Sequence, residues 1–352
     1  MYKILAINPG STSTKIAVYE EEREVFSLSL EHSSGELAQY ESVLDEFSMR
    51  KEAVLRALMD HGVAPEDLSI IVGRGGPVAP LKSGAYLVDE VLAHKLKTNP
   101  LIYHASLLGG LIGYELAQEL GIEALIYDAV STDEFSDIAR LSGLKEIPRV
   151  SLLHTLNMRA SALRYARSLG RPYEELNLIV AHLGGGLSVG LQSKGRMIDG
   201  VTDEEGPFSP ERAGRLPSTG FLNYCYEHDK AFVAKKIRGQ GGLVSYLGTS
   251  DAREVDRRAL EGDHEANLVF EAMAYQVAKA IGELATVVDG VVDGIILTGG
   301  MAYNERFTGW IKRRVSFIAN VIIIAGENEL ESLALGGLRV LRGEEEVNRY
   351  ED

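Results

Sequence analysis

Two segments that share one pattern constrain the fold of this chain most. In each, a short apolar run leads into a turn rich in glycine, serine and threonine, and a second apolar run follows; the segments span residues 4–18 and 178–191. Both patterns predict β-hairpins. Because glycine reaches positive φ and carries no side chain, such a turn can present several backbone N–H groups and hydroxyls to one anion. The sequence therefore predicts two phosphate-binding turns in a molecule with two related halves.

Strand and helix patterns alternate around these hairpins. The apolar spacing predicts, in chain order, helix 36–61, strand 69–72, helix 104–120, strand 124–127, helix 268–288, strand 294–297, strand 322–325 and helix 329–341. This alternation favours an α/β architecture. Since 352 residues exceed what one core usually organises, we expect two domains, residues 1–152 with 331–352 and residues 153–330. We expect a ligand in a cleft between them and a frayed tail at residues 343–352.

Composition excludes several classes of function. The net charge of -15 opposes attraction to nucleic acid or to an anionic membrane surface. The single cysteine, Cys225, excludes an internal disulfide and a zinc site built from several cysteines. No uninterrupted apolar stretch reaches the roughly 20 residues of a membrane helix, and no secretory signal is visible. We therefore expect a soluble, cytoplasmic protein that binds neither nucleic acid nor membrane.

The common nucleotide-binding fingerprints are missing. No Gly-Lys dipeptide completes a Walker A loop, and no G-x-G-x-x-G motif opens a helix. Motifs spread over nearly the whole chain instead resemble, in the same order, those of the acetate and butyrate kinases, and of the butyrate kinases in particular. The motifs are Asn8–Lys15, Gly73–Gly76, Tyr127–Ala129, His154–Thr155, His182–Gly186, Phe208–Gly214, Leu297–Gly300 and Gly326–Glu329.

This resemblance implies a fold, a reaction and cofactors. The family is part of the actin-like, sugar-kinase and heat-shock ATPase superfamily, which implies two related ribonuclease-H-like α/β domains with a central cleft. The implied reaction is direct, in-line and reversible phosphoryl transfer from ATP to a short-chain fatty acid, which gives an acyl phosphate and ADP and uses Mg²⁺. Relatives associate, so the resemblance also implies a homo-oligomer.

The same resemblance implies roles for individual residues. Arg74 and Arg212 flank the reacting groups, and His154 donates a hydrogen bond to the transferring phosphoryl group. Asp128 and Glu329 are the acids on the Mg²⁺ side, and Asp128 also belongs with the catalytic residues. The expected nucleotide and phosphate contacts are Asn8, Ser11, Ser13, Lys15, His182, Gly184, Gly185, Gly186, Gly299, Gly300 and Asn304.

Residue types alone leave other interpretations open. An arginine more often forms a surface salt bridge than a substrate contact, and a histidine is more often structural than reactive. Asp128 can be the cap of a following helix, and Glu329 a solvated acid in the first turn of a helix. A further acidic cluster fits a solvated loop better than a second metal site; it consists of Asp199, Asp203, Glu204 and Glu205.

The acceptor is expected to be a carboxylate. A carboxylic acid with a pKa of about 4 is already ionised at neutral pH, so its attack on phosphorus needs no base. A sugar hydroxyl needs one, and Asp128 is placed to supply it, so a sugar or polyol kinase is the alternative; a non-metabolic actin- or chaperone-like ATPase is another. Gly75-Gly76 and Leu153 replace bulkier residues of acetate kinases, which implies a larger acyl pocket. Its expected lining is Gly76, Val78, Leu153 and Pro210.

Overall fold

The computed structural model describes residues 1–351, and the chain divides into two compact units. Unit 1 contains Met1–Asp133 and Asn328–Asp352, and unit 2 contains Glu134–Glu327. The predicted division differs from this one chiefly at residues 134–152, which lie with unit 2. The reason is that Phe135 packs in the core of unit 2, and the Ser136 N–H donates to the carbonyl of Ile198 at 2.9 Å.

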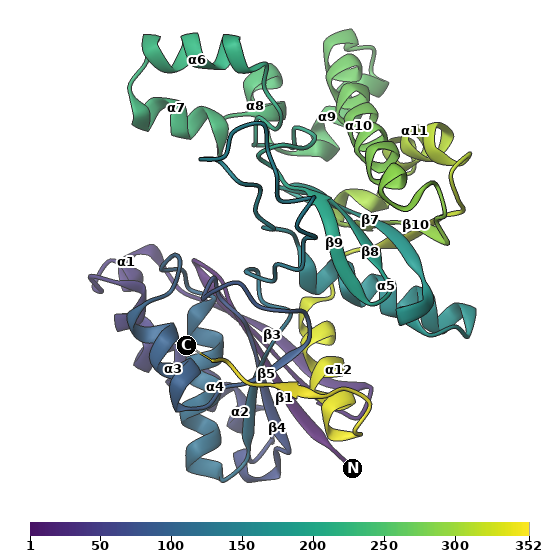
Figure 1. The fold of residues 1–352 in the computed structure, drawn as a ribbon. Helices are drawn as coiled ribbons and strands as arrows, with labels where there is room; N and C mark the ends of the chain where they lie inside the picture. Colours follow the sequence, from purple (N-terminus) through teal and green to yellow (C-terminus); the bar gives the residue numbers. More distant parts are fainter. Residues whose placement is uncertain (352) are drawn as a thin grey trace. The chain divides into compact units, whose positions relative to one another are not determined.

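Unit 1 is built on a seven-stranded mixed sheet in the order β12-β5-β6-β4-β1-β2-β3 (Figure 1). The strands are β1 (Lys3–Pro9), β2 (Ser13–Glu20), β3 (Arg23–Glu31), β4 (Ile70–Arg74), β5 (Ala85–Leu87), β6 (Glu123–Tyr127) and β12 (Val347–Asn348). The first three strands are antiparallel, and β1, β4 and β6 run parallel. The prediction of a frayed tail is wrong for β12, because this strand pairs with β5.

Helices cover both faces of this sheet. The helix α4 (Leu107–Leu120) packs on β4, β6 and β1, and α12 (Glu329–Leu341) packs on β1 and β4. Alternate residues of β4 face opposite ways, since Ile71 belongs to the same core as Leu111 of α4. On the α12 side, Val72 lies so close that a Cβ on Gly337 would meet it at 2.6 Å. The glycines of the closing helix thus allow a close approach to the sheet.

The predicted helix 36–61 is broken into three pieces. They are α1 (Ser34–Leu37), the 3₁₀ turn η1 (Val43–Glu46) and α2 (Phe47–Asp60). The break follows from Ser42, whose N–H and hydroxyl both bind the Asp45 carboxylate, at 2.9 and 2.8 Å. This local pairing starts a new turn instead of continuing the first helix. Unit 1 also contains η2 (Pro65–Asp67) and α3 (Glu90–Thr98).

Unit 2 is built on a five-stranded sheet in the order β11-β10-β7-β8-β9. The strands are β7 (Asn177–Leu183), β8 (Leu187–Ser193), β9 (Arg196–Val201), β10 (Gly294–Gly299) and β11 (Val321–Ala325). The long helix α10 (His264–Ala285) and the helix α5 (Thr155–Leu169) cover opposite faces (Figure 1). Ile179 packs with Phe270 of α10, whereas the residues on either side of it in β7, Leu178 and Val180, pack with Met158 of α5.

The remaining elements of unit 2 surround this framework. They are η3 (Tyr173–Glu175), α6 (Ser218–Glu227), α7 (Lys230–Ile237), α8 (Gly242–Leu247), α9 (Ala252–Leu260), η4 (Thr286–Val288), η5 (Gly300–Tyr303) and α11 (Glu305–Val315). Over residues 1–351, no helix combines the length and apolar character that crossing a bilayer requires.

The two sheets repeat one strand order. In unit 1 the order β3-β2-β1-β4-β6 has an antiparallel three-stranded part followed by two parallel strands, and β9-β8-β7-β10-β11 repeats it in unit 2. The first strand of each set leads through a glycine- and serine-rich turn into the second. The prediction of two related α/β halves, each containing one of the two hairpins, is therefore confirmed.

Candidate functional site

In unit 1, predicted site residues follow three neighbouring parallel strands. Asn8 lies near the end of β1, Arg74 ends β4, and Asp128 comes directly after β6. The register pairs Ile7 with Gly73 and Arg74 with Tyr127, so these ends lie at one edge of the sheet. Ligands of open α/β sheets bind at this edge, beyond the carboxyl ends of the strands.

Glu329 joins this edge from the first turn of α12. Its Oε1 accepts a hydrogen bond from Arg74 Nη1 and its Oε2 accepts one from the amide of Asn8, both at 2.5 Å. The Arg74 and Glu329 side chains are 26% and 22% exposed, so the pair is open enough to exchange partners. Glu329 is therefore an ion-paired acid, and the structure brings three predicted residues together around one carboxylate.

Asp128 has a different environment. It is buried, its backbone has φ 42°, and its Oδ1 accepts a hydrogen bond from the backbone N–H of Gly84 at 2.7 Å. A positive φ is rare for a residue other than glycine and marks a constrained position. The next helix in the chain is α5, so the helix cap that residue type alone favoured is not formed.

Arg50, which the sequence analysis missed, binds the backbone of the first glycine- and serine-rich turn. This fully buried guanidinium pairs with Glu46 at 2.6 Å and donates to the carbonyls of Gly10 and Ser13 at 3.0 Å and of Ser11 at 3.3 Å. The turn carbonyls are thereby directed toward Arg50. Ser11 is exposed and Ser13 is half-buried. The only sequence signal was an acid and an arginine four residues apart, a spacing more typical of an exposed helix face.

Lys15 has no comparable support at this turn. It is exposed on β2, between the buried residues Thr14 and Ile16. The alternation of the strand directs its side chain to the solvent side.

His104 is a second residue that the sequence analysis did not single out. It lies just before α4, and its Nδ1 is 2.9 Å from the Ser106 hydroxyl. Burial, together with the positive charges of Arg74 and Arg50, holds the pKa of His104 below its usual value. A neutral imidazole near Arg74 adds a hydrogen-bonding group without adding charge. A lone histidine before a helix gave no specific signal in the sequence.

In unit 2, the two predicted histidines form a stacked pair. The rings of His154 and His182 lie 3.9 Å apart between centroids and are inclined by only 8°. Ser188 contacts His154 Nδ1 at 2.9 Å, and Asn157 contacts His182 Nδ1 at the same distance. The remaining nitrogen of His182 is 3.2 Å from the Glu327 carboxylate. The structure therefore brings together two predicted site residues that are 28 positions apart in the sequence. Each of them has a polar neighbour.

Arg212 lies against the second glycine-rich turn. A Cβ on Gly186 would collide with its guanidinium, so the absence of a side chain there makes room for Arg212. Gly184 and Gly186 close the turn through an N–H to carbonyl bond of 3.2 Å, and the hydroxyl of Ser209 binds the carbonyl of Gly185 at 2.8 Å. The predicted phosphate turn and the predicted arginine are thus neighbours.

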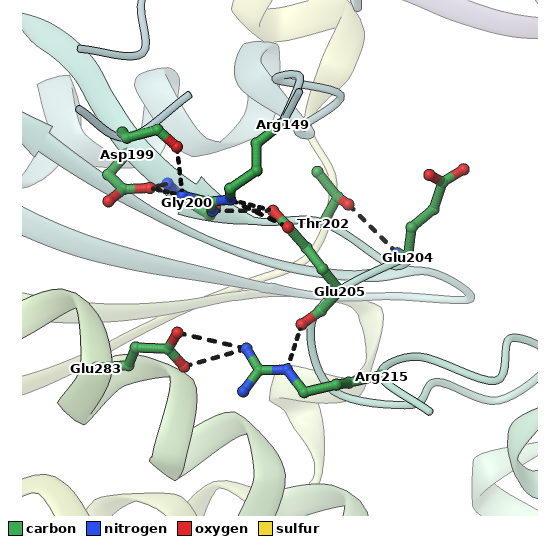
Figure 2. A network of polar contacts seen from close by, with 9 residues as sticks. Arg149, Asp199, Gly200, Thr202, Glu204, Glu205, Arg215 and Glu283 are labelled. Carbon is green, nitrogen blue, oxygen red and sulfur yellow. Dashed lines mark hydrogen bonds and ion pairs between the residues drawn. The ribbon is translucent and has the colours of Figure 1, made fainter. Parts of the chain in front are cut away.

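The acidic cluster next to Arg212 is not a solvated loop. Asp203 is buried and pairs with Arg212 and, at 3.0 Å, with Arg238. Figure 2 shows Asp199 and Glu205 on the two sides of Arg149, with contacts of 3.0 and 2.9 Å. Of the four acids, only Glu204 is exposed. The solvated-loop prediction is wrong because arginines from three parts of unit 2 neutralise this cluster.

Arg149 connects the start of unit 2 to the loop that precedes Arg212. Besides the two acids it donates to the carbonyl of Gly200 at 2.5 Å (Figure 2). It also donates to the carbonyl of Ala139 at 2.7 Å. Arg215 continues the connection, since it binds the carbonyl of Glu205 at 2.8 Å and the Glu283 carboxylate at 3.2 Å. The loop that carries Arg212 is therefore anchored at both ends.

The predicted nucleotide residues after β10 have mainly structural contacts in this structure. Gly299 has φ 91°, and a Cβ there would lie 2.5 Å from the carbonyl oxygen of Leu183. Gly300 is exposed and starts η5. Asn304 caps α11 by accepting from the Phe307 N–H at 2.8 Å, and its amide donates to Asp256 at 2.7 Å. The nucleotide role of these residues stays a prediction.

The glycines of the predicted acyl pocket do not by themselves leave free volume. A Cβ on Gly76 would meet the Leu107 side chain at 2.5 Å, and one on Gly75 would meet Ala129 at the same distance. These neighbours fill the space that a larger residue would take. Leu153 is buried in the core with Met158, while Val78 and Pro210 are buried in units 1 and 2 respectively. The pocket lining stays a prediction. The expectation that small residues enlarge the pocket does not hold at Gly75 and Gly76, because neighbouring side chains fill the space.

The residues near Glu329 fit a magnesium ion that is bound mainly through phosphates. Within residues 1–351, no three acids, histidines or cysteines are grouped so that they alone could hold a metal. Mg²⁺ in kinases commonly takes only one or two protein carboxylates and completes its shell with phosphates and water. The carboxylate of Glu329 and the amide oxygen of Asn8 are oxygen ligands of this type, 3.5 Å or less from Arg74 Nη1.

Comparison with known proteins agrees with this arrangement. The model of the Acetokinase family matches residues 154–333. The chain is 48% identical to "Butyrate kinase 1" of Clostridium acetobutylicum, over 99% of this chain and 100% of that protein. An acetate kinase of Porphyromonas gingivalis shares the fold with a TM-score of 0.80 at 18% identity, covering 97% of this chain and 100% of that chain. A propionate kinase of Francisella tularensis gives 0.75 at 18% identity, with 96% and 99% covered. These similarities confirm the predicted fold class.

Proposed function

This chain belongs to the acetokinase family, and we propose that its preferred acid is butyrate or a branched acid of similar size. The enzyme transfers a phosphoryl group from ATP to the carboxylate of a short-chain fatty acid and forms an acyl phosphate and ADP. Full-length similarity to a butyrate kinase confirms the predicted family, reaction and acceptor. It does not favour the sugar kinase or the chaperone-like ATPase as alternatives.

The acid site is assigned mainly from the hydrogen bonds that Arg74 makes to a carboxylate. Arg74 and Asn8 already bind both oxygens of one carboxylate, that of Glu329. The planar fork of arginine matches a carboxylate, and the half-exposed pair allows a substrate carboxylate to take the same position. Because the acid arrives ionised, no base is required, and Asp128 can keep its hydrogen bond to Gly84 throughout the reaction.

The phosphoryl group is proposed to bind the residues of unit 2. Arg212 lies against the second glycine-rich turn, His182 lies in β7 just before this turn, and His154 stacks on His182. Phosphoryl transfer depends on positioning and on positive or hydrogen-bonding groups around the three equatorial oxygens. The anchored loop around Asp203 supports this, since it fixes the guanidinium before the substrate binds.

Magnesium is the divalent metal that we propose for this reaction. Glu329 and Asn8 would hold it, directly or through water, and Asp128 is the further acid at the same sheet edge. When bound, the ion would neutralise charge on the nucleotide phosphates. The chain's own residues supply the remaining functions, which are to bind the acid, orient it and exclude water.

A panel of acids tests both the reaction and the acyl preference. ATP is supplied with acetate, propionate, butyrate, isobutyrate, valerate, isovalerate or hexanoate, and hydroxylamine traps any acyl phosphate as a hydroxamate. We expect hydroxamate with the largest kcat/KM for acids of four or five carbons. Each methylene is worth about 10- to 200-fold at most, so neighbouring acids will overlap. ATP consumption with sugars and no hydroxamate from any acid would refute the proposal.

Oligomeric state and cellular location remain predictions. The family resemblance implies a homodimer or larger assembly, and the acidic composition with a single cysteine fits the cytoplasm. Light scattering of the purified chain, compared with its 38.4 kDa mass, tests the first of these.

A further inference from the structure

Asn157 is a buried residue that contacts His182, one of the two stacked histidines. It lies on α5, three residues after His154, and is 6% exposed. Its amide nitrogen is 2.9 Å from His182 Nδ1 and 3.2 Å from the hydroxyl of Thr298. Neither the predicted site residues nor the groups of the proposed function include it.

The neighbours of Thr298 determine which way this amide points. The Thr298 hydroxyl is 3.3 Å from the carbonyl of Gly326, which can only accept, so the single proton of Thr298 is donated there. Thr298 Oγ1 must then accept from its other partners, Ser161 and Asn157, each at 3.2 Å. The atom of Asn157 that faces Thr298 is therefore the NH₂ group and not the carbonyl oxygen.

The same NH₂ group faces His182, which fixes the proton of that imidazole. Since Asn157 Nδ2 donates, His182 Nδ1 must be the unprotonated, accepting nitrogen. We propose that Asn157 holds His182 as a neutral imidazole protonated on Nε2. A doubly protonated ring would direct an Nδ1–H at the N–H of Asn157, two donors facing each other in a buried site.

The protonated nitrogen then lies at the second glycine-rich turn. His182 Nε2 is 3.2 Å from the Glu327 carboxylate, and a Cβ on Gly184 would lie 2.8 Å from the same nitrogen. Asn157 thus directs a hydrogen-bond donor toward the turn. It also keeps one ring of the stacked pair uncharged, which avoids two imidazolium rings at 3.9 Å. The consequence for catalysis rests on the proposed function, because it takes this turn as the phosphate site.

Nitrogen NMR of labelled histidine tests the tautomer without any substrate. The full-length chain is labelled with ¹⁵N in its 8 histidines, and the His182 signals are identified by their loss in His182→Gln. At neutral pH we expect a pyridine-type Nδ1 and a pyrrole-type, protonated Nε2. In Asn157→Asp, a carboxylate that can only accept replaces the donor, and Nδ1 should become protonated. A protonated Nδ1 in the wild type, or an unprotonated Nδ1 in Asn157→Asp, would overturn the proposal.

Ser161→Ala is the matched control. Ser161 lies on the same helix, is buried and also binds Thr298, but it is not hydrogen-bonded to His182. Its substitution should leave the His182 tautomer and kcat unchanged. Asn157→Asp should lower kcat about 10- to 100-fold, as expected when the partner that orients a functional histidine is changed. A flipped tautomer with unchanged kcat would refute the positioning role, whereas no acyl phosphate from the wild type would refute the proposed function and leave the NMR result valid.

Discussion

At the scale of single residues, the proposed acid site already contains a carboxylate, that of Glu329. Arg74 and Asn8 bind both of its oxygens, so under the proposed function Glu329 would compete with the acid substrate for Arg74. A divalent metal on Glu329 would weaken this competition, because the carboxylate would then be shared between two cations. Acid binding and metal binding are therefore expected to reinforce each other through this one side chain.

The variant Glu329→Gln should bind acid without metal better than the wild type does. It removes the charge that occupies Arg74, and a charge-assisted hydrogen bond of about 1.5–3 kcal/mol corresponds to a gain of roughly 10-fold or more. Titration calorimetry with butyrate in EDTA measures this directly. Glu331→Gln makes the same charge change on the same helix and serves as the control. Equal or weaker butyrate binding by Glu329→Gln would show that Glu329 does not compete.

Two histidines with lowered pKa values, the buried His32 and the more exposed His104, should make stability depend on pH. Burial and the charge of Arg50 lower the pKa of His32, and burial with Arg74 and Arg50 lowers that of His104. Below about pH 6.5 the unfolded chain takes up protons that the folded chain does not. The free energy of unfolding should therefore fall as the pH decreases from about 6.5 through the two lowered values, by at most about 1.4 kcal/mol per proton and pH unit.

Urea denaturation at a series of pH values measures this slope. The double variant His32→Gln/His104→Gln should lose stability less steeply between pH 6.5 and 5 than the wild type. His264→Gln changes an exposed histidine at the start of α10 and should leave the slope as it was. Parallel curves for the wild type and the double variant would contradict the assignment.

At the scale of secondary-structure elements, the first glycine- and serine-rich turn depends on α2, a helix whose bounds were not predicted correctly. Arg50 of α2 binds three turn carbonyls and the Thr14 hydroxyl, the latter at 2.9 Å, while Glu46 at the helix start neutralises it. Removing this buried arginine would leave an uncompensated carboxylate and several unpaired carbonyls. The turn and α2 are therefore one structural unit.

Arg50→Met should destabilise the fold by about 3–5 kcal/mol, the usual cost of breaking a buried ion pair. Adding Glu46→Leu removes the stranded carboxylate and should recover part of this loss, but not the part due to the turn carbonyls. Arg56→Met, at an exposed position of the same helix, is the control and should cost far less. The midpoint of urea unfolding gives all three values. A loss as small as that of Arg56→Met would mean that Arg50 does not support the turn.

The regular elements could be predicted because their patterns are local. Both hairpins, β4, β10 and α12 follow from apolar spacing and flanking glycines, and α12 has the predicted bounds. The broken helix and β12 could not, because Ser42 pairs with its own neighbour Asp45 and β12 needs a distant partner, β5. For the site, motifs pointed to the residues that are proposed to contact ligands. The residues that hold them, such as Arg50, Asn157 and Asp203, act through contacts between distant segments, which no local pattern reveals.

At the scale of the whole molecule, one half is continuous in sequence and the other is not. Unit 2 is the single segment Glu134–Glu327, whereas unit 1 needs Asn328–Asp352 as well as its first 133 residues. That second segment supplies α12, whose Leu333, Ala334 and Leu338 are buried. It also supplies β12 and Glu345, whose carboxylate binds Tyr127 at 2.6 Å. Without it, one face of the first sheet would be uncovered.

Expression of the separate segments should therefore give unequal results. Residues 134–327 should fold alone, with a cooperative thermal transition and dispersed NMR signals, because both faces of their sheet are covered by α5 and α10. Residues 1–133 alone expose the apolar face that α12 covers and should aggregate or lack fixed tertiary structure. Co-expression with residues 328–352 should restore a soluble, cooperatively unfolding unit, and the same peptide with Leu333→Asp and Leu338→Asp should not. A stable fragment 1–133 without the peptide would show that α12 is dispensable for this half.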